Sequence, residues 1–517
     1  MPRFGGLSRR AFLLGTGGGM LTMGALAACG TRGSSIVGPG SSQVADFAAA
    51  QRRPGAPVRD ARLTALAETV DLGGVRADTW TYGSGHAVGP LLRGNVGDQL
   101  RVQVVNQLPA NPPTEGGGTT TVHWHGLAIR NDMDGVPDVT QPAIEVGATG
   151  SYELTLPHPG TYLYHSHVGV QRDRGLVGPL IIDDPNDAAR YDVEFIVVLD
   201  DWIDGINGAT PDSTLADLRR TGMRMGGMSG MSGMGGMHDM GGMSGSTSAV
   251  GADGGDVSYP HYLINGRVAA APETLVARPG QRARLRLING AADTAFRIAL
   301  ADHQLEVTHT DGFPIAPTVV DTVVLGSGER YDALVTLGDG IFPLVASAEG
   351  KQGAARALVR TNSAASAPPS SAMPDQLRGK LLAYSELRAD SAVALPSRKP
   401  DRTHRLALTA DMARYVWMIN GKTFGQHEPL TVRQGERVRL VMSNQTMMYH
   451  PMHLHGHTFA LSDDNHPDGA RKDTVIVLPM QTVTVDFDAD NPGQWLVHCH
   501  QGYHEASGMM TVVSYQS

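Results

Sequence analysis

Polar and apolar residues alternate in three runs of the chain, RVQVVN (101–106), RLRLIN (284–289) and RLVMSN (439–444). This period of two predicts β-strands with one buried face. In each copy a glycine stands four residues before the arginine and nine before the last asparagine, and the openings YLINGR (262–267) and WMINGK (417–422) precede the second and third copies. The equal offsets predict three homologous β-domains at 61–190, 191–365 and 386–517, with linkers at 29–60 and 366–385.

The composition agrees with a folded, turn-rich β-protein of several domains. The chain has 517 residues, of which 41% are hydrophobic and 18% charged, with 64 glycines and 31 prolines. This length suggests about three domains of ordinary size. The formal net charge of −9 disfavours nucleic acid as a partner.

The first 28 residues read as an export signal rather than as part of a domain. Arg9 and Arg10 precede a glycine-rich apolar run that ends near Ala28, and this arrangement resembles a twin-arginine signal. The following LAAC (26–29) resembles a lipobox, which implies that Cys29 is lipidated and anchors the protein to the outer face of the cytoplasmic membrane in a bacterial cell envelope. An ordinary signal with an incidental cysteine is the alternative. The run is too weakly apolar to predict a membrane span.

Histidines gather in four short clusters, HWHG (123–126), HSH (165–167), HPMHLHGH (450–457) and HCHQGYH (498–504). In a strand, residues two apart point to the same face, so each His-x-His pair directs two imidazoles to one place and Cys499 to the opposite face. Two histidines, a thiolate and a weak methionine form the blue-copper set, which Cys499, His504, Met509 and His450 supply. The remaining eight imidazoles suit several copper ions better than zinc.

The motifs H-x-H-G, H-x-H, H-x-x-H-x-H and H-C-H-x3-H-x4-M resemble those of the multicopper oxidases, which include laccases and bacterial cuprous oxidases. The resemblance implies an all-β fold of three cupredoxin-like Greek-key β-sandwich domains and four copper ions. The mononuclear (type 1) copper would bind His450, Cys499, His504 and Met509, and the type 2 copper His123 and His453. The type 3 pair would bind His125, His165, His167, His455, His498 and His500. The trinuclear cluster would lie between domains one and three, so domain two is expected to act as a spacer without copper ligands.

The reaction implied by the resemblance consumes protons, because four one-electron oxidations at the mononuclear site would reduce O2 to two waters. Asp134 and Glu505 match the family's proton-relay acids. Asp132 and Asp138 are nearby alternatives for the first relay. The sequence therefore predicts Asp134 and Glu505 as catalytic residues.

A methionine-rich segment forms an insert in domain two, at about 205–256. Its methionines repeat every three residues among glycine and serine, at Met225, Met228, Met231, Met234, Met237, Met240 and Met243. Thioethers favour Cu(I), so this segment is predicted to collect cuprous ions. A low-complexity linker or an oxidation sponge is the alternative. Met447 and Met448 are a second possible thioether step, although Thr446 stands where copper-efflux oxidases have an acid.

These features together predict an exported cuprous oxidase that uses O2, protects the cell envelope from copper and also oxidises small aromatic diols and amines. Its partners would be O2, Cu(I) or aromatic reductants, and a membrane through the lipid anchor; the protein is expected to be a monomer. A laccase-like phenol oxidase and a non-catalytic copper-sequestering protein are the alternatives, and iron(II) and manganese(II) stay open as donors. Copper nitrite reductase is disfavoured, because it has no use for a type 3 pair.

Overall fold

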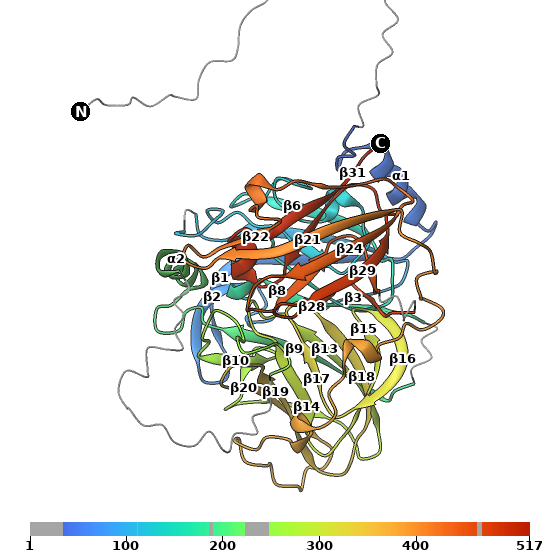
Figure 1. The fold of residues 1–517 in the computed structure, drawn as a ribbon. Coiled ribbons are helices and arrows are strands. Elements are labelled where there is room, and N and C mark those ends of the chain that lie inside the picture. The colour runs from blue at the N-terminus through green and yellow to red at the C-terminus, as the bar shows by residue number, and fades with distance from the viewer. Residues whose placement is uncertain (1–34, 111, 186–189, 223–247, 463–467) are drawn as a thin grey trace, which may run out of the picture. The chain divides into compact units, whose positions relative to one another are not determined.

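A computed structural model describes residues 35–110, 112–185, 190–222, 248–462 and 468–517. The export signal, Cys29 and the seven methionines at Met225–Met243 lie outside the described residues. Residues 36–517 form one compact unit, and the all-β prediction is confirmed (Figure 1). Among the described residues, no helix is both long and apolar enough to cross a bilayer.

Domain one is a sandwich of two four-stranded sheets. One sheet has the order β2-β1-β4-β6, formed by Arg76–Thr81, Val58–Asp71, Gln99–Gln107 and Thr149–Thr155. The other has the order β3-β8-β7-β5, formed by Leu92–Asn95, Val177–Asp183, Gly160–His165 and His123–His125. The two strands β5 and β7 carry the first two histidine clusters.

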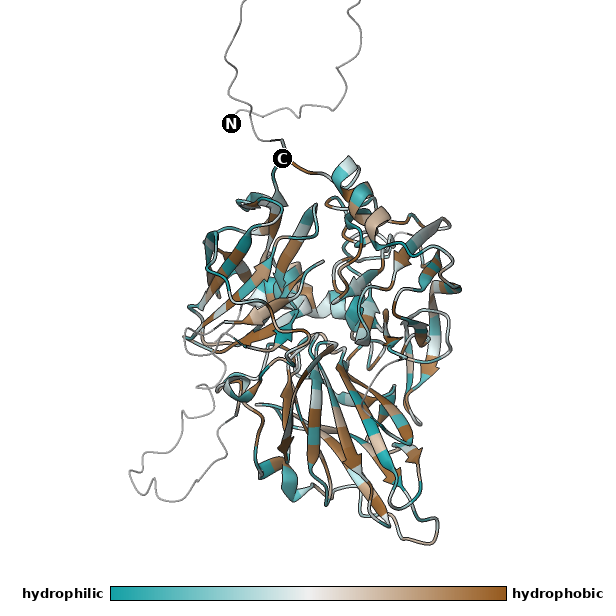
Figure 2. Cartoon of the chain, turned by 90° about the vertical axis from the view of Figure 1, so that its right-hand side faces the viewer, coloured by the Kyte–Doolittle hydropathy of each residue, from teal (hydrophilic) through white to brown (hydrophobic). Residues whose placement is uncertain are grey.

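Domain two pairs a seven-stranded sheet with a five-stranded one. The larger has the order β11-β10-β9-β13-β18-β15-β16, formed by Arg267–Val268, His261–Ile264, Val193–Trp202, Arg282–Asn289, Arg330–Thr336, Leu305–Thr310 and Phe313–Val320. The smaller has the order β12-β20-β19-β14-β17, formed by Glu273–Val276, Ala354–Arg360, Ile341–Ala348, Phe296–Leu300 and Val323–Leu325. Teal and brown bands alternate along many of its strands in Figure 2, as expected where one face is buried.

Domain three repeats the plan with six and five strands. The first sheet has the order β22-β21-β24-β29-β26-β27, formed by Val416–Ile419, Arg402–Asp411, Arg437–Asn444, Thr482–Asp488, Phe459–Leu461 and Arg471–Lys472. The second has the order β23-β31-β30-β25-β28, formed by Leu430–Val432, Met510–Tyr515, Gln494–Cys499, His450–Leu454 and Thr474–Val477. The last two histidine clusters lie on β25 and β30 and just beyond them.

The structure explains why the three sequence repeats share the same spacing. The strands β4, β13 and β24 each pair parallel with the first long strand of their domain and antiparallel with a later one. Each carries an asparagine at its last or second-last position (Asn106, Asn289 or Asn444), whose amide donates to at least two backbone carbonyls and whose Oδ1 accepts the N–H two residues on. The asparagine therefore fixes the loop that leaves the strand.

In the part of the chain that the structure describes, three α-helices accompany the sheets: α1 (Ser42–Gln51), α2 (Pro211–Thr221) and α3 (Gly502–Ala506). Helix α1 lies in the segment expected as a linker, which also contains the start of β1. The Ser41 hydroxyl caps α1 by accepting the Val44 N–H. The segment 36–57, which precedes β1, contacts both domain one and domain three. The Gln51 side chain donates to the Ala128 carbonyl of domain one, and the Val37 N–H donates to the Tyr515 carbonyl of domain three.

A buried ion cluster joins domains one and two. Asp332 on β18 accepts hydrogen bonds from Arg284 at 2.6 Å, Arg286 at 3.1 Å and the Thr161 hydroxyl of domain one at 2.7 Å. Burial raises the pKa of Asp332, but the two arginines outweigh it and lower the pKa to about 2. The ionised carboxylate therefore stabilises the folded state at neutral pH.

We expect Asp332→Asn to lower the free energy of unfolding by about 3–5 kcal/mol at pH 7, because it removes the buried carboxylate that Arg284 and Arg286 share. The carboxylate's contribution is present above its unfolded pKa, near 4, and is lost as the pH falls through about 2. Thermal unfolding of both proteins at a series of pH values checks this. A difference in melting temperature that stays constant from pH 7 to pH 2 would contradict the assignment.

Candidate metal centres

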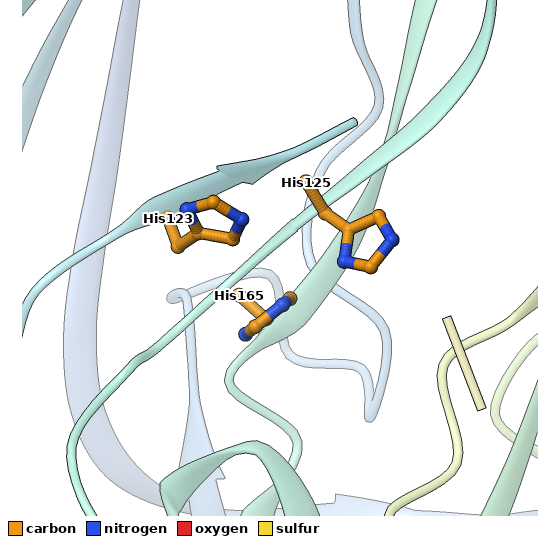
Figure 3. A group of neighbouring side chains, drawn as sticks. All are labelled: His123, His125 and His165. Atoms are coloured by element: carbon orange, nitrogen blue, oxygen red, sulfur yellow. The ribbon is translucent and has the colours of Figure 1, made fainter. Parts of the chain in front are cut away.

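The strand pairs bring the four histidine clusters together. β5 pairs with β7 so that His123 lies opposite His165, and β25 pairs with β30 so that His453 lies opposite His498. Figure 3 shows His123, His125 and His165 gathered from these two strands of domain one. All ten predicted histidine ligands and Cys499 are buried. Met509 is buried too, and its N–H donates to the His504 carbonyl at 3.0 Å.

The predicted mononuclear site has three converging ligand atoms. The Cys499 Sγ lies 3.6 Å from the His450 Nδ1 and 3.5 Å from the His504 Nδ1, and these two nitrogens are 3.2 Å apart. Burial lowers the pKa of His450 well below its usual value, which leaves a neutral ligand. Burial also raises the pKa of Cys499, so its thiolate needs a nearby cation. This donor set fits copper.

Groups around this site orient both imidazoles. The His450 Nε2 pairs with the Thr446 hydroxyl at 2.9 Å, and the His504 Nε2 pairs with Asp256 at 2.9 Å. The Trp417 ring stacks on His504 with 3.7 Å between centroids. Such partners fix the tautomer so that Nδ1 faces the metal. Asp256 comes from domain two and lies in an ordinary loop sequence, so no motif could have identified it.

The eight other imidazoles each have one nitrogen held by oxygen. Four Nδ1 atoms pair with backbone carbonyls at 2.8–3.0 Å, those of His123 with Asp134, His165 with Ser166, His453 with Asp473 and His498 with Cys499. The other four rings pair with side chains. Three do so through Nδ1, namely His455 with Asp134 at 2.9 Å, His167 with Glu505 at 3.3 Å and His500 with Ser327 at 2.9 Å, and His125 pairs with Asp473 through Nε2 at 3.1 Å.

The opposite nitrogens of these rings face one another. Those of His123, His125, His167 and His453 are buried without a hydrogen-bond partner among the described residues. The Nε2 atoms of His455 and His498 are 3.0 Å apart, and those of His165 and His500 are 3.3 Å apart. Burial lowers the pKa of His165, His455 and His500 well below the usual value, so these rings are neutral. Lone pairs this close need cations between them, so the residues fit a copper cluster.

The two predicted relay acids lie at this cluster, and the alternatives do not. Asp134 is buried and bonds His455, as above, while Glu505 approaches both His167 and, at 3.4 Å, His498. Burial raises the pKa of Glu505, but these two histidines outweigh it and bring the pKa to about 2. Asp132 pairs with Arg130 near the surface and Asp138 is exposed.

One expectation needs correction. Domain two is not only a spacer, because Asp256 and Ser327 contact predicted ligands and Arg330 contacts Asp473 beside one. Of the two methionines predicted as a second thioether step, Met447 is 67% exposed and Met448 is fully buried in the core.

Comparison with known proteins identifies the family. Residues 65–187, 242–365 and 397–517 each match a multicopper oxidase domain. The chain is 45% identical to the multicopper oxidase MmcO of Mycobacterium tuberculosis over 98% of this chain and 96% of that protein. It is 28% identical to a copper resistance protein A homolog of Pseudomonas syringae pv. tomato, over 83% of this chain and 88% of that one.

Solved structures show the same fold. The multicopper oxidase Fet3p aligns with a TM-score of 0.72 at 22% identity, covering 89% of this chain and 90% of that one. The Botrytis aclada laccase aligns with a TM-score of 0.70 at 23% identity, covering 89% and 88%. The chain belongs to the multicopper oxidase family. It is therefore an oxidoreductase with copper cofactors.

Proposed function

We propose that this protein oxidises Cu(I) at a mononuclear copper and passes the electrons to O2 at a trinuclear cluster, with four coppers in all. One observation carries the proposal. Cys499 lies in the predicted mononuclear site, while its covalent neighbours His498 and His500 lie in the predicted trinuclear site. Copper, when bound, supplies the one-electron redox chemistry and the binding of O2. The chain supplies the route, through the Cys499 thiolate and the backbone of β30.

Protons would reach the cluster through the two buried acids. Asp134 keeps one carboxylate oxygen without a hydrogen-bond partner among the described residues. Glu505 is 8% exposed and lies between His167 and His498. A carboxylate that touches the ligands can hold and release a proton at the site. We assign the relay role to these two residues.

Cu(I) is the preferred donor because soft and acidic groups meet at the edge of the mononuclear site. The segment that follows residue 247 reaches this edge, where Asp253 forms a β-bridge with Met448 and Asp256 bonds His504. The exposed Met447 thioether stands beside that bridge in the sequence. Thioether donors favour Cu(I), and the carboxylates add negative charge that attracts a cation. Relatives named for copper resistance support a role in copper detoxification.

We expect deletion of residues 223–247 to reduce O2 uptake with Cu(I) several-fold while sparing uptake with a simple phenol, because the methionines would gather cuprous ions only. The measurement is O2 consumption by the copper-loaded protein with stabilised Cu(I) or a phenol as donor. A variant with the seven methionines replaced by leucine controls for the length of the segment. Equal changes with both donors would favour the laccase-like reading instead.

Aromatic donors are a second candidate because a cavity of about 490 Å³ is linked to the mononuclear site by hydrogen bonds. Its lining includes Tyr415, Phe424 and Met510. The Tyr415 hydroxyl donates to Asp256, which bonds His504. Two hydrogen bonds would therefore connect a phenol that contacts Tyr415 to a predicted copper ligand.

Export and anchoring complete the proposal. The support is the RR and LAAC signals in residues 9–29. We expect Cys29→Ser to move the protein from the membrane fraction to the soluble envelope fraction, because a lipid chain would be its anchor. Fractionation of expressing cells with an antibody to the protein checks this. Retention of the variant in the membrane fraction would contradict lipidation.

A further inference from the structure

A short loop of domain two forms one wall of the trinuclear site. Its sequence is GSGER (326–330), and it joins β17 to β18. At Gly328 a Cβ would lie 2.8 Å from the His125 ring and 3.0 Å from the His500 ring, and φ is +87°. The backbone therefore packs directly on one type 3 ligand from domain one and one from domain three, in a conformation that favours glycine.

Ser327 in this loop holds His500 together with Arg172 of domain one. The Ser327 hydroxyl donates to the Ala291 carbonyl and its oxygen lies 2.9 Å from the His500 Nδ1. The Arg172 guanidinium contacts the same Nδ1, lies 3.0 Å from the Nε2 and donates to the His500 carbonyl. The ring is therefore fixed between a side chain of domain one and a side chain of domain two, with its Nε2 3.3 Å from the His165 Nε2.

Arg330 contacts Asp473, which in turn bonds His125, the predicted type 3 ligand from domain one. Its guanidinium donates to both carboxylate oxygens of Asp473, at 2.7 and 2.6 Å, and to the Thr161 carbonyl of domain one at 3.0 Å. Asp473 in turn accepts from the His125 Nε2 at 3.1 Å, which leaves the unpartnered Nδ1 of that ring for metal. Arg330 and Asp473 are both fully buried.

The H-x-H-G motif is built around this pair. A Cβ at Gly126 would lie 2.5 Å from the Arg330 Nη2 and 2.5 Å from the Asp473 Oδ2. Only glycine leaves room for the arginine beneath His125. Next to Asp473, the buried Lys472 pairs with two buried carboxylates of domain two, those of Asp311 and Glu329, at 3.0 Å each. Domain two therefore holds ligands from both other domains by specific contacts.

We propose that Ser327 and Arg330 are positioning residues through which domain two holds the rings of His500 and His125 in place, and thereby sets the type 3 copper affinity. The inference rests on the proposed copper assignment. It extends that assignment to a domain that contributes no ligand among the described residues.

The first test compares Ser327→Ala with the conservative Ser327→Thr. The alanine variant should lose about 10–100-fold in affinity for trinuclear copper, while the threonine variant keeps the hydroxyl and should recover most of it. Copper content, the electron paramagnetic resonance of the type 2 site and the thiolate-to-copper absorption of the mononuclear site are recorded on each copper-loaded protein. Thr322→Val, at another buried hydroxyl of domain two that bonds only the Ile298 carbonyl, is the matched control.

The second test compares Arg330→Met with Arg284→Met. Arg284 is also a buried domain-two arginine that pairs with an aspartate, and its Nε and Nη2 donate to one oxygen of Asp332 at 3.0 and 2.6 Å. Unlike Asp473, Asp332 bonds no predicted ligand among the described residues. Both variants should destabilise the metal-free protein. Only Arg330→Met should also reduce the extra stability that copper confers and alter the type 2 signal, and Arg330→Lys should restore part of both.

The outcomes distinguish a failure of the positioning role from a failure of the copper assignment. Loss of trinuclear signals with an intact thiolate-to-copper band in Ser327→Ala and Arg330→Met supports it. Unchanged trinuclear signals in these variants, or equal changes in Arg284→Met and Thr322→Val, would overturn it and leave domain two as a structural support. If the wild-type protein itself binds no trinuclear copper, the copper assignment fails, and the positioning role with it.

Discussion

Cys499→Ser is expected to abolish the thiolate-to-copper absorption of the loaded protein and to reduce O2 uptake with any donor to the level of a protein-free control. Cys499 is the one group shared by the route between the two centres, because its side chain meets His450 and His504 while its neighbours are His498 and His500. A serine hydroxyl is a hard, weakly acidic ligand and does not replace a thiolate. Visible spectroscopy and an oxygen electrode measure both effects.

The control for this variant is the type 2 signal of the trinuclear site, which should persist because none of its ligands changes. Its persistence would separate a broken electron route from a misfolded protein. Substantial O2 uptake by Cys499→Ser with an intact type 2 signal would contradict the assigned route. The second cysteine, Cys29, lies outside the described residues and has no part in this prediction.

Asp134→Asn and Glu505→Gln are each expected to slow O2 reduction by about 10²–10⁴-fold, because an amide cannot hold and release a proton at the cluster. Both changes preserve shape, and Asp134 bonds His123 partly through its backbone carbonyl, so copper should still bind. Stopped-flow measurement of the reoxidation of the fully reduced protein isolates this step from donor oxidation.

Asp132→Asn is the matched control for Asp134→Asn. Asp132 lies two residues away in the same short turn, but its carboxylate pairs with Arg130 near the surface. Its rate of reoxidation should equal that of the wild-type protein. A reduction by Asp132→Asn as large as that by Asp134→Asn would show that the turn, rather than the buried carboxylate, is responsible.

The ligands could be found from the sequence because strand geometry is local. A His-x-His pair on a strand places both rings on one face whatever the rest of the chain does. The same alternation predicted that the Cys499 side chain points to the opposite face from His498 and His500. It also predicted the three repeated strands. Helix α1 could also have been found, since Ser41 is a good N-cap before an alanine-rich run, but its position outside the repeats concealed it.

The residues around the ligands could not be found this way. Asp473, Ser327 and Arg330 are common residue types, and their contacts join positions far apart in the chain. Only the packing of three domains shows that they meet. The spacer prediction was wrong for the same reason: domain two lacks histidine clusters, yet its hydroxyl and charged side chains support the copper ligands.

The most direct test of the account is the ratio of Cu(I) oxidised to O2 consumed by the copper-loaded protein, with hydrogen peroxide measured in the same reaction. The account predicts sustained uptake with four Cu(I) oxidised per O2 and no peroxide, because the trinuclear site would complete the reduction to water. Cu(I) binding without O2 uptake would contradict it and favour copper sequestration. Accumulation of peroxide would contradict the assigned cluster.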